Sequence, residues 1–293
     1  MRIPVPPVRL GQDVVDLAAE YADGRREPVE PRDAATVVLT RNGSRTGAGP
    51  DVYLLRRQTS MEFAAGMCVF PGGGVDPRDF DDHDVRWAGP DAATWAARLG
   101  TDEATARALV CAAVRETFEE SGVLLAGESA DTVVADVTGE DWERDRAALE
   151  GRELAFTDFL ERRGLVLRTD LLAPWRAWLT PEFEPRRYRT WFFAAVLPEC
   201  QRTRDVSTES DAVAWLPSLE AVAQADAEEI LMLPPTWMTC LEVGQYADAA
   251  SVLAAGSDRS VEMFMPELTE DGDDAGATLT TPPWMQGLLE PRP

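Results

Sequence analysis

The chain has 293 residues, of which 45% are hydrophobic and 27% charged, as is usual for a globular protein of one or two domains. Its formal net charge is -24, and every basic residue is an arginine. This composition excludes a P-loop lysine and a Schiff base, and it disfavours nucleic acid or an anionic membrane as partner. Carboxylates dominate, and they act as acid–base pairs or as ligands of hard cations.

Cysteine and histidine offer little alternative chemistry. Four cysteines lie far apart without a C-x-x-C pair, and the single histidine, His83, lies in an acidic polar stretch. We therefore expect buried thiols in a reducing compartment and no zinc site. Residues 1–10 lack the apolar core of a signal peptide, and 290–293 match no retention or peroxisomal signal. The expected location is cytoplasmic.

The first elements of the chain are predicted to be strands. β-rich runs at 34–39 and 51–56 flank a turn-like Asn42-Gly43 and predict a hairpin. Residues 66–76 predict a short strand running into a glycine-rich turn. Glycines in such a turn either allow close approach of the backbone or take positive φ.

A long helix is predicted after a polar segment. Residues 77–100 indicate a surface insertion with a short helix at 92–99. The long helix should then run from about Asp102 to Ser121, with Thr101 as its N-cap and Gly122 as its stop.

The second half of the chain alternates between helical and strand-like patterns. Helices are predicted at 142–150, 156–163, 218–227 and 236–255, and strands at 175–179, 188–197 and 212–216. The tail 266–293 is acidic and punctuated by proline and glycine. Strands separated by helices, after an opening hairpin, predict an α/β/α arrangement around a mixed sheet.

Three glutamates share one sector at the end of the long helix. Glu116, Glu119 and Glu120 stand at i, i+3 and i+4 and so project from one face. Like charges near a helix C-terminus repel one another and oppose the helix dipole, whereas a divalent cation reverses that cost. A solvated, glutamate-rich helix end is the alternative interpretation. The apolar residues on the opposite side, predicted to pack on the sheet, are Val110, Cys111, Val114 and Phe118.

The segment 115–123, Arg-Glu-Thr-Phe-Glu-Glu-Ser-Gly-Val, resembles the second half of the Nudix box, G-x5-E-x7-R-E-U-x-E-E-x-G-U, where U is aliphatic. Phe-Pro-Gly-Gly-Gly at 70–74 resembles its opening. Gly73 precedes Arg115 by 42 positions instead of 14, so about 28 residues are inserted. At the regular spacing the first glutamate of the box is replaced by Arg107, and Glu103 is the nearest carboxylate in the helix.

An insertion inside the box resembles one Nudix subgroup, which includes peroxisomal CoA and acyl-CoA diphosphatases and bacterial relatives. The likeness extends to 54–57, 180–188 and 233–236. It implies a Nudix-type α/β/α sandwich with a mixed β-sheet, plus helical insertions and a C-terminal extension. The implied boundaries are a domain at 31–245, with insertions at about 77–100 and 126–170, and an extension at 246–293.

The resemblance also implies hydrolysis of the pyrophosphate linkage in a nucleoside diphosphate linked to X. CoA or an acyl-CoA is the first choice, and ADP-ribose, NADH or a nucleotide sugar is the alternative. A non-catalytic Nudix-fold binding module is a further alternative, against which the intact glutamates argue. The implied partner is a small-molecule diphosphate, and the sequence leaves a homodimer open.

The resemblance assigns a role to each box residue. Glu116 and Glu120 are the expected ligands of Mg²⁺ or Mn²⁺, and Glu119 is a third ligand or a base that orients water. Arg115 is expected to position the glutamates through ion pairs. Gly72 and Gly73 should bring the backbone close to the metal and substrate.

Residues outside the box complete the predicted site. Glu209, in the loop before the 212–216 strand, is the candidate for a further base, with a solvated loop acid as the alternative. Arg57, Arg186 and Arg187 are the candidates for gripping phosphate, each with an ordinary surface position as the alternative.

Overall fold

The computed structural model describes residues 10–58, 64–80, 85–270 and 277–289, and His83 lies outside them. The chain divides into two compact units. The larger unit contains 34–176 and 191–262, and the smaller contains 1–33, 177–190 and 263–293. Among the described residues, no helix is long and apolar enough to cross a membrane.

This division differs from the predicted boundaries at 31–245 and 246–293. In the smaller unit, the strand β11 (Met263–Phe264) pairs in parallel with the end of β8 (Leu172–Leu179). The segment after 262 therefore belongs with 177–190, while the helix α8 (Ala249–Gly256) stays in the larger unit. Strand pairing between distant segments sets the boundary between the two units, and the composition along the chain gives no sign of it.

The main sheet is built on the predicted opening hairpin. Its strands are β1 (Arg32–Arg41), β2 (Asp51–Arg57), β9 (Tyr188–Val196) and β10 (Ser210–Pro217), together with β8. Their order is β10-β2-β1-β9-β8. The β1–β2 and β2–β10 pairs are antiparallel, which confirms the hairpin. β3 (Cys68–Val69) adds to β2, and β4 (Gly72–Gly74) adds to β1.

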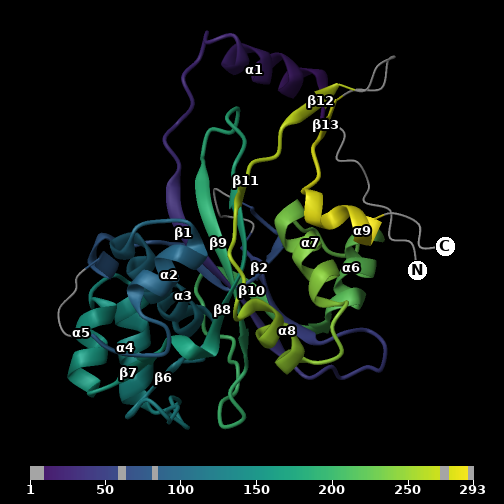
Figure 1. Ribbon diagram of the computed structural model, residues 1–293. Helices are drawn as coiled ribbons and strands as arrows, with labels where there is room; N and C mark the ends of the chain where they lie inside the picture. Colours follow the sequence, from purple (N-terminus) through teal and green to yellow (C-terminus); the bar gives the residue numbers. More distant parts are fainter. Residues whose placement is uncertain (1–9, 59–63, 81–84, 271–276, 290–293) are drawn as a thin grey trace. The chain divides into compact units, whose positions relative to one another are not determined.

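Helices cover both faces of this sheet (Figure 1). One layer contains α2 (Ala92–Leu99), α3 (Glu103–Ser121), α4 (Glu140–Glu150) and α5 (Phe156–Arg163). The opposite layer contains α6 (Ser218–Asp226), α7 (Pro234–Val243) and α8. The predicted α/β/α sandwich is thus confirmed. Its core includes Val37, Val38 and Leu39 of β1, which are fully buried.

Several further elements are short or belong to the smaller unit. They are α1 (Gln12–Ala22), which the sequence analysis did not predict, the 3-10 helices η1 (Pro77–Phe80), η2 (Thr169–Leu171) and η3 (Pro283–Met285), the antiparallel pair β12 (Leu268–Glu270) and β13 (Ala277–Leu279), and α9 (Gln286–Leu289).

The glycine run is a strand, not the predicted turn. Gly72 pairs with Thr36 in antiparallel register. A Cβ on Gly72 would lie 2.5 Å from the carbonyl oxygen of Ala35 and 2.7 Å from the Cα of Thr36. Glycine is required here because two backbones approach closely, and not because of positive φ.

The apolar residues predicted on one side of α3 are buried, but burial is not limited to that side. Phe118, which was expected to pack on the sheet, stacks on Phe159 of α5 with ring centroids 5.6 Å apart. From Ala106 to Ser121 nearly every side chain is buried, the glutamates included. The insertion helix α5 thus packs on the face that was predicted to dock on the sheet.

The N-cap of α3 is Asp102, not Thr101. Its side chain accepts hydrogen bonds from Thr105 N at 2.9 Å and Thr105 Oγ1 at 2.7 Å. Asp102→Ala should therefore destabilise the protein by about 1 kcal/mol, which lowers the Tm by roughly 2–4 °C. Thr101→Ala is the matched control, with an expected change within about 0.5 kcal/mol. Thermal denaturation of both variants checks the assignment, and an equal loss in both would contradict it.

The two insertions form one substructure. β5 (Arg86–Ala88) of the first pairs in parallel with β7 (Val166–Arg168) of the second, and β6 (Ala126–Gly127) completes a three-stranded sheet. The helices α4 and α5 belong to the same insertion as β6 and β7. The two insertions, which are separate in the sequence, therefore pack together beside α3.

The predicted helix 236–255 is two helices. α7 ends at Val243 with Gly244 as its C-cap, and α8 begins after the N-cap Asp248, whose side chain accepts a hydrogen bond from Ser251 N at 2.7 Å. The apolar pattern is continuous across this region and does not show the break between the two helices. The side chain of Asp248 stabilises the start of the second helix.

Candidate active site

A pocket lies at the C-terminal end of α3 and is lined by residues of the larger unit alone. β4, η1, the last turns of α3, the turn after α4 and the loop before β10 all contribute to it. The predicted site residues that line it are Arg57, Gly72, Gly73, Arg115, Glu116, Glu119, Glu120 and Glu209. Folding thus brings together residues that are up to 152 positions apart in sequence.

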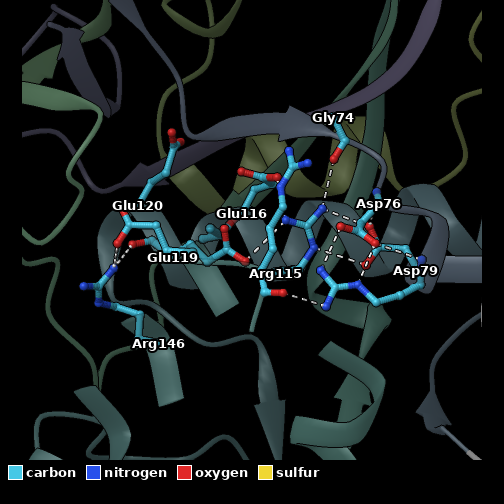
Figure 2. A network of polar contacts seen from close by, with 12 residues as sticks. Gly74, Asp76, Asp79, Arg115, Glu116, Glu119, Glu120 and Arg146 are labelled. Atoms are coloured by element: carbon cyan, nitrogen blue, oxygen red, sulfur yellow. Dashed lines mark hydrogen bonds and ion pairs between the residues drawn. The ribbon is translucent and has the colours of Figure 1, made fainter. Parts of the chain in front are cut away.

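Arg115 is the centre of the polar network in this pocket (Figure 2). Its Nη1 donates to Glu116 Oε1 at 2.6 Å and to Glu119 Oε1 at 3.3 Å. Its Nε and Nη2 donate to the two carboxylate oxygens of Asp79 at 3.1 and 2.9 Å, and Nη2 also donates to the Gly74 carbonyl at 3.0 Å. All five guanidinium donors are therefore used. The ion pairs to the glutamates are those expected from the sequence.

Asp79 is the acidic residue that the sequence analysis missed. It is only 3% exposed, and burial raises its pKa while the charge of Arg115 lowers it. Asp79 stands six positions after Gly73, which is the G-x5-E spacing with aspartate in place of glutamate. The regular spacing counted back from Arg115 leads through the insertion to Arg107, with Glu103 as the nearest carboxylate. Counting forwards from Gly73 would have found Asp79. With Asp79 as the first acid of the box, the inserted residues follow η1.

The three glutamates of the box are buried carboxylates. Glu116, Glu119 and Glu120 are 9%, 6% and 8% exposed. Burial is the largest cause that raises the pKa of each, and it brings the pKa of Glu119 to about 8, with a further contribution from the charge of Glu116. The Gly72 amide, 2.7 Å from Glu120 Oε2, opposes this rise at Glu120. Without a counter-charge, ionised carboxylates are costly at these positions.

Two arginines stabilise the acidic end of α3. Arg146 of α4 donates from Nη1 to the Glu119 carbonyl at 2.7 Å, and the Arg204 backbone amide donates to the Ser121 carbonyl at 2.8 Å. Glu143 accepts from both guanidinium groups, at 2.6 and 2.8 Å. Positive charge at a helix C-terminus offsets the dipole, so these contacts compensate part of the cost of the glutamates.

Gly122 ends α3 as predicted, with φ of 71°. A Cβ there would lie 2.7 Å from Arg204 Nε. The position therefore needs glycine for its left-handed backbone and also for the close approach of Arg204.

Strand pairing brings Glu209 to the pocket. Ser210 at the start of β10 pairs with Arg57 at the end of β2, and Arg57 Nη2 lies 3.2 Å from Glu209 Oε2. The preceding residue, Thr208, donates from N and Oγ1 to Glu150 of α4, at 2.7 and 2.8 Å. The second insertion thus holds the loop that carries Glu209. No hydrogen-bond partner of the buried Arg57 Nε occurs among the described residues.

Arg186 and Arg187, predicted to grip phosphate, belong to the smaller unit and are not among the residues that line this pocket. Arg187 is buried and donates to the carbonyls of Thr180 and Val29, both at 3.1 Å. Those bonds hold the Arg187 side chain within the smaller unit, and its assignment to phosphate binding stays a prediction. The assignment of the exposed Arg186 stays a prediction.

The donor chemistry of the pocket suits a hard divalent cation. Its acids present only carboxylate oxygen, the ligand that Mg²⁺ and Mn²⁺ prefer. In the part of the chain that the structure describes, no three such side chains are gathered into a metal-binding cluster. Arg115 and the Gly72 amide donate hydrogen bonds to oxygens of Glu116 and Glu120.

The fold and this glutamate-lined pocket define a Nudix hydrolase. The sequence model described as the NUDT19 Nudix domain matches residues 89–242, which is more than half of the chain and begins after the glycine strand. The chain belongs to this Nudix family.

Relatives and a solved structure agree with this assignment. Putative nudix hydrolase 7 of Caenorhabditis elegans is 27% identical over 74% of this chain, which spans 62% of that protein's length. The acyl-coenzyme A diphosphatase NUDT19 of Gallus gallus is 26% identical, and the alignment covers 79% of this chain and 72% of that protein. A NUDIX hydrolase structure from Alicyclobacillus acidocaldarius is 26% identical with a TM-score of 0.67, and the match covers 78% of this chain and 98% of that one.

Adjacent glycines of β4 should respond differently to an added methyl group. A Cβ on Gly73 would lie 2.6–2.7 Å from the Glu116 carboxylate, which is the movable end of a side chain. Gly73→Ala should therefore keep the fold but displace Glu116 and reduce hydrolysis about 10- to 100-fold. Gly72→Ala meets backbone atoms and should lower stability instead. Activity and Tm of both variants check this, and unchanged activity in Gly73→Ala would contradict the placement of Glu116.

Proposed function

We propose that this chain is a Mg²⁺- or Mn²⁺-dependent hydrolase that cleaves the pyrophosphate linkage of a nucleoside diphosphate linked to X, with CoA or an acyl-CoA as substrate. The observation that carries the metal dependence is the set of three buried glutamates with raised pKa values around one pocket. A sequence selected for stability alone would not keep three buried acids beside one arginine, because their mutual repulsion is costly.

The names of two relatives support the substrate. The Gallus gallus and Xenopus laevis relatives, 26% and 24% identical, are both described as acyl-coenzyme A diphosphatases. ADP-ribose, NADH and nucleotide sugars remain the alternatives, since the pocket geometry does not separate them from CoA. The retained Glu116, Glu119 and Glu120 speak against a purely binding role.

In this proposal each residue has a defined task. Glu116 and Glu120 would hold the metal, with Glu119 as a third ligand or a base that orients water, and a bound metal would supply Lewis-acid stabilisation of charge on the phosphates. Arg115 keeps Glu116 and Glu119 aligned through its hydrogen bonds. A water attacks one phosphorus, the bridging P–O bond breaks to release a phosphomonoester, and Glu209 accepts the proton of the water.

A substrate panel tests the proposal. Pure protein with Mn²⁺ or Mg²⁺ should release phosphomonoesters from CoA or acyl-CoA, and EDTA should abolish the release. Reaction in ¹⁸O-labelled water followed by mass spectrometry identifies the phosphorus that is attacked. If CoA, acyl-CoA, NADH, ADP-ribose and nucleotide sugars all survive with both metals, the proposed function is wrong. If only another member of the panel reacts, the CoA assignment alone is wrong.

Metal binding should be visible without any substrate. Mn²⁺ at a hundred times its Kd should stabilise the protein by about 2.7 kcal/mol, a Tm rise of roughly 5–10 °C. Glu120→Gln should lose most of this rise, because one ligand and one charge are removed. A Tm that does not respond to Mn²⁺ or Mg²⁺ would contradict the metal assignment. A cytoplasmic location and a homodimeric state stay predictions that cell fractionation and light scattering can address.

A further inference from the structure

Four arginines line the pocket, and Arg152 differs from the other three. Arg57, Arg78 and Arg115 each pair with an acid of the same pocket, at 3.2, 2.8 and 2.9 Å. Arg152 is exposed, and its side chain makes no hydrogen bond or ion pair with any residue that the structure describes. Of the four arginines that line the pocket, Arg152 is thus the one whose charge is not paired with an acid among the described residues.

The backbone of Arg152 has an unfavourable conformation. Its φ is +57°, in the left-handed region that favours glycine, although the turn after α4 has a glycine one position earlier, at Gly151. Ala64 and Glu228 also have positive φ, but they do not line the pocket. A side chain is therefore retained at the pocket in a conformation where glycine would be more stable.

Contacts on both sides hold the main chain of Arg152. Its amide donates to the Leu149 carbonyl of α4 at 2.8 Å, and its carbonyl accepts from Arg78 Nη1 at 3.1 Å. Arg78 is itself fixed by Asp76, which accepts from Nε at 2.8 Å and from Nη2 at 2.9 Å. The turn after α4 is thereby tied to the segment that follows the glycine strand, so Arg152 stands at a defined place on the pocket rim.

The charge of the pocket indicates what Arg152 binds. The acids that line it are Asp76, Asp79, Glu116, Glu119, Glu120, Glu150 and Glu209. A diphosphate that enters this acidic surface needs a cation for the oxygens that the metal does not hold, and a guanidinium group can hold two phosphate oxygens at once. We infer that Arg152 binds a phosphate group of the diphosphate substrate, so that the second insertion forms part of the substrate site. This inference rests on the proposed function.

Arg152→Gly is the informative variant, because it removes the guanidinium group and also relieves the backbone. We expect a KM about 10- to 100-fold higher, with kcat within about threefold of the original and a Tm that is unchanged or raised. Arg144→Ala is the matched control: it removes an exposed arginine of α4 that does not line the pocket, and should leave KM unchanged. Arg152→Lys should recover only part of the loss.

A binding measurement separates this inference from the proposed function. Calorimetric titration in Mg²⁺ buffer with methylenediphosphonate, a diphosphate that cannot be hydrolysed, should show about 10-fold weaker binding to Arg152→Gly than to Arg144→Ala. If no substrate is hydrolysed but this difference persists, the inference stands without the proposed function. If substrates are hydrolysed and both KM and this affinity match the control, or if kcat alone falls, the inference is overturned.

Discussion

Replacing Glu120 by glutamine should reduce diphosphate hydrolysis by about a thousandfold while leaving the fold intact. The amide has nearly the same shape as the carboxylate but carries no charge to hold a metal ion. A metal that polarises phosphate oxygens contributes several kcal/mol to the transition state, and each 1.36 kcal/mol corresponds to tenfold in rate. Glu120 is 8% exposed and burial holds its pKa well above the usual range, so the neutral amide should not destabilise the metal-free protein.

Glu103→Gln is the matched control for this variant. Glu103 lies on the same helix but at its exposed N-terminal end, and the sequence had offered it as the nearest carboxylate for the first acid of the box. Initial rates at saturating Mn²⁺ should stay within about threefold of the original in Glu103→Gln. A Glu120→Gln protein that retains more than a tenth of the original rate would contradict its assignment as a ligand.

Replacing Arg115 by alanine should lower the free energy of unfolding by about 3–5 kcal/mol, because it leaves buried acids without their counter-charge. Asp79 would lose both of its guanidinium hydrogen bonds, and Glu116 and Glu119 would lose theirs. The expected fall in Tm is roughly 10 °C, to be measured by denaturant and thermal unfolding of the metal-free protein.

The matched control is Arg45→Ala, which breaks an ion pair of similar length on the surface. Arg45 Nη1 lies 2.7 Å from Glu220 Oε2, but its side chain is 69% exposed, so the expected loss is at most about 1 kcal/mol. A double variant with Asp79→Asn should lose less than the sum of the single losses, since the two residues share one network. Equal losses in Arg115→Ala and Arg45→Ala would show that the buried network does not stabilise the fold.

Some features of the site were unreadable from the sequence because they depend on pairing between distant segments. Glu209 could be chosen only as an acid in a loop, and the β10–β2 register is what sets it beside Arg57. The burial of α3 is another such feature. Its pattern predicted one face that docks on the sheet, whereas in the structure Phe118 of that face stacks on Phe159 of α5 and the glutamates of the opposite face are buried too.

The sequence by itself determined the opening hairpin, the long helix, the α/β/α class and the glutamates of the Nudix box. These depend on local periodicity and on motif spacing, both of which a single chain displays directly. Only the tertiary structure decided that Asp79 pairs with Arg115, that the two insertions share one sheet, and that Arg152 faces the pocket without a partner among the described residues. Those facts depend on which distant segments pack together, and the sequence pattern of each segment is compatible with several such arrangements.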